Sequence, residues 1–78
     1  MTNLETYKNC FVEALELELK NVEDAKAESL KRWDSIGQMS LVALIEDAFE
    51  IEFEPDELMS FNSYTSGLEI LKNHGVEF

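Results

Sequence analysis

The segment from Ser35 to Glu50 constrains the fold most strongly, because its apolar residues follow the period of an α-helix. They recur at spacings of three and four residues and cover a broad face. The residues that we expect to be buried on this face are Met39, Leu41, Val42, Leu44, Ile45, Ala48 and Phe49. A helix with so wide an apolar face must pack against other elements, so the rest of the chain has to supply them.

The chain before this helix predicts a first helix and a long connection. Thr2 and Glu5 have the spacing of a capping box at the start of the first helix. Its apolar face consists of Leu4, Tyr7, Phe11, Ala14 and Leu15. The helical period fails after about Leu17, and residues 18–33 form a long, mostly polar loop with room for a short helical turn. A loop of this length in a compact domain is usually functional.

The chain after the central helix predicts one short helix and one longer one. Residues 50–54 alternate between Glu and apolar side chains, which predicts an extended segment with Ile51 and Phe53 directed inward. Pro55 suits the first position of a short third helix that ends near Phe61. The fourth helix is defined by Asn62 or Ser63 as its cap, by Tyr64, Leu68, Ile70 and Leu71 on its apolar side, and by Gly75 as its stop.

These elements predict an all-α fold. With one Pro and three Gly in the whole chain, few breaks separate the helices. We expect a four-helix bundle with three longer helices, one short third helix and a long loop between helices 1 and 2. A length of 78 residues leaves room for one domain, which we expect to span residues 1–78.

The charge is strongly negative, with 17 acidic against 6 basic residues and a formal net charge of −11. Such a balance excludes nucleic acid and an anionic membrane surface as partners, and it favours a protein partner with a basic patch. Nine acids and no Lys or Arg lie between Trp33 and Leu71. No apolar run approaches the roughly 18 residues of a spanning helix, and the start has no basic leader. We expect a stand-alone, monomeric, cytoplasmic protein without membrane insertion.

The residues that could catalyse a reaction do not form a recognisable set. One cysteine, Cys10, excludes an internal disulfide and a paired-cysteine metal site, and we expect it to be a small buried thiol. A serine hydroxyl needs a positioned base to act as a nucleophile. The only histidine, His74, is predicted at the far end of the last helix. The acidic run lacks the loop of an EF-hand. We therefore expect neither an enzyme nor a metal site.

The most informative local feature is the stretch Trp33-Asp34-Ser35-Ile36-Gly37. It places a serine at the start of the central helix, directly after the long loop. Unpaired N–H groups and the helix dipole would stabilise a phosphate ester on that hydroxyl. An alternative is that the stretch only caps the helix, through Asp34 or through a capping box of Ser35 and Gln38.

In a wider context the chain resembles an acyl carrier protein over about residues 3–74. The resemblance is carried by Asp34-Ser35-Ile36-Gly37, by residues 41–49 of the central helix and by residues 51–57 that lead into the short helix. It implies that Ser35 bears a 4′-phosphopantetheine arm, transferred from coenzyme A by a phosphopantetheinyl transferase. It also implies that acyl groups are held on this arm as thioesters and presented to other enzymes, and that the carrier itself catalyses nothing.

The resemblance further implies a docking surface for partner enzymes. In the family, acids on the central helix meet basic patches on the enzymes that load and transfer acyl groups, and Glu46 and Asp47 occupy matching positions. The candidate partner-binding residues are Asp34, Ile36, Ser40, Ala43, Glu46 and Asp47.

Several positions depart from the family pattern. Ile36 replaces the usual Leu, Gly37 stands where an acid is common, and Trp33 stands where a small residue is frequent. We expect Trp33 to pack the loop against the core. These departures favour a specialised lipid, polyketide or surface-molecule pathway over fatty acid biosynthesis. Two alternatives remain open, an aminoacyl or peptidyl carrier and an acidic helical adaptor or inhibitor without a prosthetic group.

Overall fold

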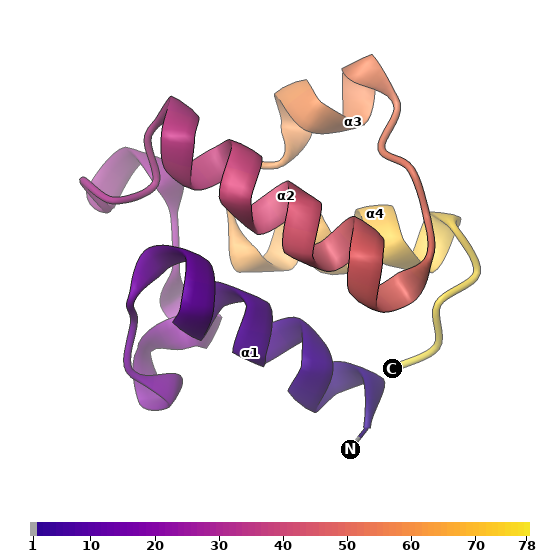
Figure 1. Ribbon diagram of the computed structural model, residues 1–78, viewed down its shortest axis with the longest axis horizontal. Coiled ribbons are helices and arrows are strands. Elements are labelled where there is room, and N and C mark those ends of the chain that lie inside the picture. Colours follow the sequence, from indigo (N-terminus) through magenta and orange to yellow (C-terminus); the bar gives the residue numbers. More distant parts are fainter. Residues whose placement is uncertain (1) are drawn as a thin grey trace.

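The computed structural model of the protein describes residues 2–78, and these residues form helices joined by short and long connections (Figure 1). The elements in chain order are α1 (Asn3–Leu15), the 3₁₀ helices η1 (Leu19–Asp24) and η2 (Ala27–Ser29), α2 (Ser35–Phe49), α3 (Pro55–Ser60) and α4 (Tyr64–Asn73). The predicted all-α bundle, with three longer helices and a short third one, is therefore confirmed. Helices α1 and α2 run side by side in opposite directions, and α4 lies behind α2 in this view (Figure 1).

Helix α1 begins where the sequence predicts and ends slightly earlier. The Thr2 side chain accepts a hydrogen bond from the Glu5 N–H at 3.1 Å, and the Glu5 carboxylate accepts one from the Thr2 N–H at 3.2 Å, which completes the capping box. The helix ends at Leu15 because Glu16 adopts the left-handed conformation, with φ of 53°. Leu17 thus already belongs to the connection.

The long connection is held to the bundle at its middle. Its two 3₁₀ helices confirm that the loop contains helical turns. Val22 and Ala25 are buried and fasten it to the core. Backbone hydrogen bonds then tie it to the start of α4: Tyr64 N–H donates to the Ala25 carbonyl, and Ala27 N–H donates to the Asn62 carbonyl. The loop before α2 is therefore packed and hydrogen-bonded as part of the fold.

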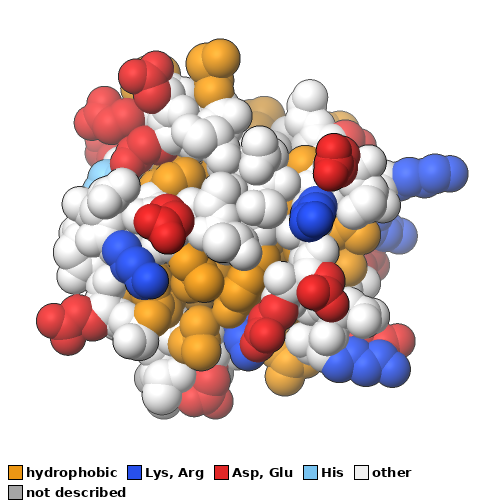
Figure 2. Space-filling model, turned by 180° about the vertical axis from the view of Figure 1, so that it is seen from behind, with side chains coloured by type: hydrophobic (Ala, Val, Ile, Leu, Met, Phe, Trp, Pro, Cys, Tyr) orange, Lys and Arg blue, Asp and Glu red, His pale blue; other side chains and the backbone are white. Residues whose placement is uncertain are grey.

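The charges are distributed unevenly over the surface. Five of the six Lys and Arg residues precede Trp33, in α1 and the connection. Figure 2 shows basic side chains mainly toward the edge away from the histidine, with acidic side chains on both sides. Within residues 2–78, no helix has the length and apolar character needed to cross a membrane.

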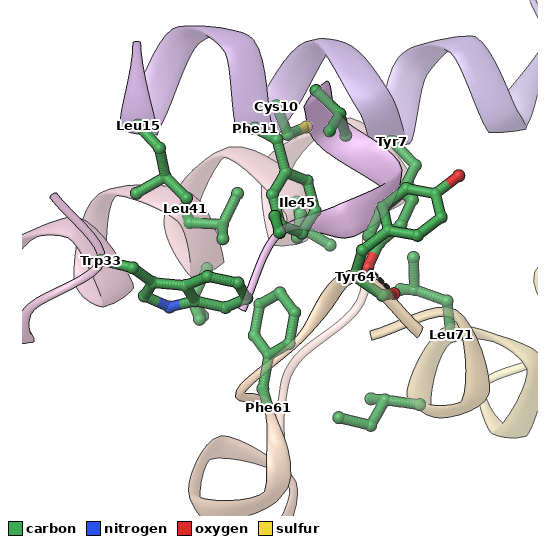
Figure 3. Packing of buried hydrophobic residues seen from close by; sticks show 14 of the residues in the cluster. Tyr7, Cys10, Phe11, Leu15, Trp33, Leu41, Ile45, Phe61, Tyr64 and Leu71 are labelled. Carbon is green, nitrogen blue, oxygen red and sulfur yellow. Dashed lines mark hydrogen bonds between the residues drawn. The ribbon is translucent and has the colours of Figure 1, made fainter. Parts of the chain in front are cut away.

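The core contains aromatic side chains from α1, from α4 and from the segments that join the helices (Figure 3). The Phe11 ring meets Tyr7, Trp33, Phe61 and Tyr64 at centroid distances between 5.0 and 6.1 Å. The Tyr7 hydroxyl donates a hydrogen bond of 2.7 Å to the Tyr64 carbonyl, deep in the bundle. One buried polar contact thus fixes α1 against α4 within an otherwise apolar core.

The structure corrects the predicted burial on α2. Met39 was expected in the apolar face but is 73% exposed, and Ala48 is also exposed. The helix is turned so that Leu41, Val42 and Ile45 face the core, which leaves Met39 on the outer side. A broad apolar stripe predicts the buried face of a helix only to within about one residue position per turn. The packing of the helix against its neighbours sets its exact rotation.

The second half of the chain follows the prediction closely. Phe53 is buried and Ile51 half-buried after α2, and Pro55 occupies the first turn of α3. Of the two candidate caps for α4, Ser63 is the one used, because its side chain accepts from the Ser66 N–H at 3.1 Å. Gly75 has φ of 88° and ends α4, as the sequence indicates.

Candidate functional site

At the start of α2 one residue caps the helix, and the next residue carries the serine hydroxyl. Asp34 is the cap, since its Oδ1 accepts a hydrogen bond of 2.9 Å from the Gly37 N–H. The alternative capping box of Ser35 and Gln38 is wrong, because the Gln38 side chain is bonded elsewhere. Ser35 is the exposed first residue of the helix, and within residues 2–78 its hydroxyl has no hydrogen-bond partner. The hydroxyl is therefore open to another molecule.

Gly37 brings the loop close to this helix start. It is buried, and a Cβ placed on it would collide with the backbone carbonyl of Arg32 and touch the side chain of Leu15. An acid at this position, common in the resembling family, would not fit here. The Arg32 side chain reaches outward and forms an ion pair with Glu16. Close packing of backbone on backbone thus fixes where the chain enters α2.

Trp33 anchors the loop from the other side. Its side chain is 5% exposed and lies edge-on to Phe11 and Phe61, at centroid distances of 5.5 and 5.3 Å. The expected packing of the loop on the core is confirmed. The indole N–H donates a hydrogen bond of 2.6 Å to Gln38 Oε1, and Gln38 Nε2 donates one of 3.1 Å to the Leu58 carbonyl in α3. The sequence pointed to Gln38 only as the partner of Ser35 in a capping box, and nothing in the sequence indicated its contacts with Trp33 and Leu58.

The outer face of α2 gathers most of the candidate partner-binding residues. Ile36 is 77% exposed, and Ser40, Ala43 and Asp47 are exposed at spacings of three and four residues along the same face. Asp34 lies just before them. Met39, which the sequence assigned to the core, joins this exposed surface. The start of α2 thus presents a mixed apolar and acidic surface beside the Ser35 hydroxyl.

Glu46 differs from its neighbour Asp47. It is half-buried, and its Oε2 accepts a hydrogen bond of 2.8 Å from the Phe53 N–H. The carboxylate therefore holds the extended segment after α2 against the helix. Asp47 is exposed, so its charge is the freer of the two for a partner.

An apolar groove lies between α2 and α3. Its volume is about 390 Å³. The groove is lined by Gln38, Met39, Val42, Ala43, Glu46, Leu58 and Met59. Met59 is 83% exposed and, with Met39, stands at its rim. We call this feature the α2–α3 groove.

Two other side chains could act as a base or a nucleophile, but His74 is in contact with Glu57 and Cys10 is buried. His74 Nε2 lies 2.8 Å from Glu57 Oε1, between the end of α4 and α3. Hydrogen bonding from the Glu54 N–H, and next from His74, holds the pKa of the Glu57 carboxyl below its usual range. Burial, helped by the charge of Glu13, raises the pKa of the Cys10 thiol to about 11. Cys10 is buried as expected and stays a thiol at neutral pH.

The acidic side chains do not converge on a common point. Among residues 2–78, no three or more His, Cys, Asp or Glu side chains are placed to hold a metal ion. The carboxylates after Trp33 are spread over α2, the extended segment, α3, α4 and the C-terminal segment.

Comparison with known protein families matches residues 8–66 to the family described as the phosphopantetheine attachment site. The match covers most of the chain, so the protein belongs to this family. Comparison with curated proteins and with solved structures gives no significant match. Domains of this family contain the site at which 4′-phosphopantetheine is covalently attached. Members of the family are carriers that are typically not catalysts. The chain is therefore a phosphopantetheine-carrying protein, and the resemblance to acyl carrier proteins is confirmed at the level of the family.

Proposed function

We propose that Ser35 is the attachment residue and that the protein carries acyl groups for partner enzymes. The single observation that carries this proposal is the state of the Ser35 hydroxyl. It is exposed, it has no hydrogen-bond partner among residues 2–78, and Asp34 performs the capping that a serine at this place would otherwise perform. When attached, the arm supplies a terminal thiol on which an acyl group is held as a thioester.

The environment of Ser35 suits a phosphodiester. The first N–H groups of a helix have no partner within the helix, and the aligned dipoles give this end a partial positive charge. Asp34 uses the Gly37 N–H, which leaves the N–H groups of Ser35 and Ile36 at the open end of the 15-residue helix α2. A negative group on the Ser35 oxygen would lie against them.

The protein leaves the activation of that hydroxyl to another enzyme. A serine becomes a nucleophile when a base removes its proton, and His74 is engaged with Glu57 at the other end of the bundle. A phosphopantetheinyl transferase would supply the base and the coenzyme A. The acyl-handling enzymes would supply all later chemistry.

Partner enzymes would dock on the outer face of α2. Its exposed apolar side chains, Ile36 and Met39, can enter a partner's surface. The surrounding acids, including Asp34 and Asp47, can meet a basic patch, which steers the encounter. We propose this surface, with Ser40, Ala43 and the half-buried Glu46, as the partner-binding site. Glu46 also serves the fold, so its substitution would affect stability as well as docking.

The proposed pathway rests on the positions at which this chain departs from the family pattern. Trp33 and Gly37 depart from the family pattern, and both are built into the packing around Ser35. These features support a specialised lipid, polyketide or surface-molecule pathway.

The test is attachment itself. The purified protein is incubated with coenzyme A and a broad-specificity phosphopantetheinyl transferase, and its mass is measured. We expect the mass to increase by one phosphopantetheine group, and Ser35→Ala to show no increase. Thr65→Ala, which removes an exposed hydroxyl from α4, away from the proposed partner-binding site, should be modified like the wild type. A folded wild-type protein that gains no mass, or a Ser35→Ala variant that does, contradicts the proposal.

A further inference from the structure

Helix α2 borders α1 on the side opposite to α3 (Figure 1), and adjoining hollows run between these two helices. We call them together the α1–α2 furrow. The middle hollow has a volume of about 740 Å³ and shares residues with the hollow at each end. It is lined by Glu13, Ala14, Ser40, Ala43, Leu44 and Asp47. The furrow therefore extends along most of the length of α2.

The furrow begins next to Ser35. Its first hollow is lined by Asp34 and Ile36, the two chain neighbours of Ser35, and by Ser40 about one turn further along. The helical rise from Ser35 to Asp47 is about 18 Å. A standard protein interface buries about 800 Å² on each partner, which is a wider patch than this length. One interface at Ser35 can therefore cover the whole furrow.

Two carboxylates line the furrow from opposite helices without a cation between them. Glu13 belongs to α1 and Asp47 to α2, and both are exposed. The ion pairs among residues 2–78 join other side chains, so neither carboxylate is compensated there. Like charges across a hollow repel each other, and a cation placed between them would be attracted by both. Ala14 beside them is small, which leaves room for the side chain of a partner.

The phosphopantetheinyl transferase is the partner whose position is fixed at this place. In the transfer, the Ser35 oxygen attacks the phosphorus that bears the pantetheine group, a base of the transferase takes the proton, and adenosine 3′,5′-bisphosphate leaves. No arm yet bridges any distance, so the transferase surface must lie directly on the start of α2. Because coenzyme A carries a diphosphate and a further phosphate on its ribose, that surface has to be basic.

We propose that the transferase binds α1 as well as α2 and places an arginine or lysine side chain in the α1–α2 furrow, between Glu13 and Asp47. This inference rests on the proposed function and extends docking from the outer face of α2 to a second helix. Arg32 lines the furrow near Ser35, but its charge is compensated by Glu16 and opposes the incoming cation less. Glu13 is thus a docking residue that takes no part in the transfer itself.

The first experiment measures the kinetics of modification by a broad-specificity phosphopantetheinyl transferase with coenzyme A. We expect Glu13→Gln to raise KM for the carrier about threefold and Glu13→Lys about tenfold, because the introduced charge repels the cation of the transferase. kcat should stay unchanged, since the Ser35 hydroxyl and the start of α2 are not altered. Glu69→Gln and Glu69→Lys, on the exposed side of α4, change the net charge equally and should change KM by less than about twofold.

Ala14→Gln tests the furrow without a change of charge. Ala14 is half-buried and lines the middle hollow and the hollow next to Ser35, so a longer side chain fills the furrow from the α1 side. We expect KM to rise about fivefold at an unchanged kcat. Thr65→Gln, a similar enlargement on the exposed side of α4, is the matched control and should leave KM unchanged.

NMR chemical shifts locate the contact without any turnover. The transferase and coenzyme A are added to isotope-labelled Ser35→Ala, which cannot be modified at that position. We expect the amide signals of Glu13 and Ala14 on α1 to shift or broaden together with the signal of Asp47 on α2. The signal of Glu69 on α4 should not change.

The outcomes distinguish this inference from the function on which it rests. A folded wild type that accepts no arm contradicts the proposed function, and the inference falls with it. If the wild type is modified and Asp47→Lys raises KM, while Glu13→Lys behaves like Glu69→Lys, the transferase docks on α2 alone and only the inference is wrong. Unchanged α1 signals in the complex, or an unchanged KM for Ala14→Gln, overturn it as well.

Stability separates a lost contact from a damaged fold. Glu13→Gln removes one of two charges that repel each other, so we expect it to be at least as stable as the wild type in urea. A higher KM in this variant then reports docking. If Glu13→Gln raises KM only in proportion to a loss of helical circular dichroism, the contact with the transferase is not the cause and the inference is wrong.

Discussion

Asp34 and Ser35 are adjacent in the chain but have separate tasks at the start of α2. Asp34 turns its carboxylate to the Gly37 N–H and so completes the helix end. Ser35 is left as an exposed hydroxyl without a partner among residues 2–78. Because the cap is supplied by the residue before it, a modification of Ser35 need not disturb the helix.

Gly37 is the residue at which the fold of this site is most sensitive. We expect Gly37→Ala to destabilise the protein by about 1–3 kcal/mol, because the new Cβ overlaps the Arg32 carbonyl and the backbone must shift. The helix propensity of alanine would by itself stabilise α2 by about 1 kcal/mol, so the sign of the change decides between crowding and propensity. Urea unfolding followed by circular dichroism measures it. Ser40→Ala, exposed on the same helix, is the control, and a Gly37→Ala variant as stable as this control would contradict the prediction.

At the scale of the element, α3 is short and is held from two directions. Pro55 and the capping residues Glu54 and Glu57 define its start, while His74 from the end of α4 contacts the Glu57 carboxylate at 2.8 Å. Gln38 holds its middle at the Leu58 carbonyl. A six-residue helix has little stability of its own, so these contacts determine how firmly α3 is held.

The hydrogen bonds of the Glu57 carboxylate predict that the stability of the protein depends on pH. Its pKa is lowered in the folded protein, chiefly by the hydrogen bond from the Glu54 N–H and then by His74. The stabilisation is therefore present above the unfolded pKa, near 4.5, and is lost as the pH falls through the lower folded pKa. We expect Glu57→Gln to lose less stability than the wild type on acidification from pH 6 to pH 3, in urea titrations at each pH. Glu69→Gln, on the exposed side of α4, should retain the wild-type slope, and equal slopes for Glu57→Gln and wild type would refute the assignment.

The elements were predictable from the sequence because each has a local signal. The capping box at Thr2, Pro55 at the start of α3 and Gly75 after α4 are all visible in the sequence and are used as expected. The exposure of Met39 and the contact of Glu46 with the Phe53 N–H were not predictable. Both depend on how α2 is rotated against α1 and on the path of the segment that follows it. Tertiary packing sets these, and the sequence of one helix does not contain them.

The candidate site shows the same division. Ser35 and its exposure follow from its place at a helix start after a long loop, together with the acid that precedes it. The two hydrogen bonds of the Gln38 side chain connect the loop, α2 and α3. The residues that they join are up to 25 positions apart, from Trp33 to Leu58. No pattern in the sequence brings these three together, so only the structure reveals them.

At the scale of the whole molecule, Tyr7 connects the first helix with the last. Its hydroxyl donates to the Tyr64 carbonyl at 2.7 Å, and the side chain is fully buried. Burial raises the pKa of the phenol well above its usual value, so the hydroxyl remains protonated and a donor at neutral pH. The ring also touches Phe11 and Phe78, so α1, α4 and the C-terminal segment meet at this residue.

We expect Tyr7→Phe to lower the free energy of unfolding by about 1–3 kcal/mol, because it leaves the buried Tyr64 carbonyl without its donor. Urea unfolding gives the measurement. Tyr64→Phe removes a hydroxyl from the neighbouring ring, whose side chain makes no hydrogen bond among residues 2–78, and should cost much less. Similar losses for both variants would show that the Tyr7 hydrogen bond is not the cause.

The net charge of −11 acts over the whole molecule, but the docking proposal locates its effect at α2. A transferase with a basic patch should be attracted from a distance by the total charge and oriented by the acids nearest Ser35. Asp47→Lys and Glu69→Lys change the net charge by the same amount, yet only Asp47 lies on the proposed surface. We expect Asp47→Lys to lower kcat/KM for modification by the transferase about tenfold at low salt, and Glu69→Lys to lower it much less.

Salt distinguishes this electrostatic effect from a steric one. In 1 M salt the screening length falls to about 3 Å, so exposed charges no longer attract a partner at a distance. The modification rates of wild type and Asp47→Lys should then converge. If Asp47→Lys stays tenfold slower at high salt, the lysine obstructs docking by its shape. If both lysine variants are equally slow at low salt, the total charge alone guides the partner, and α2 is not its docking surface.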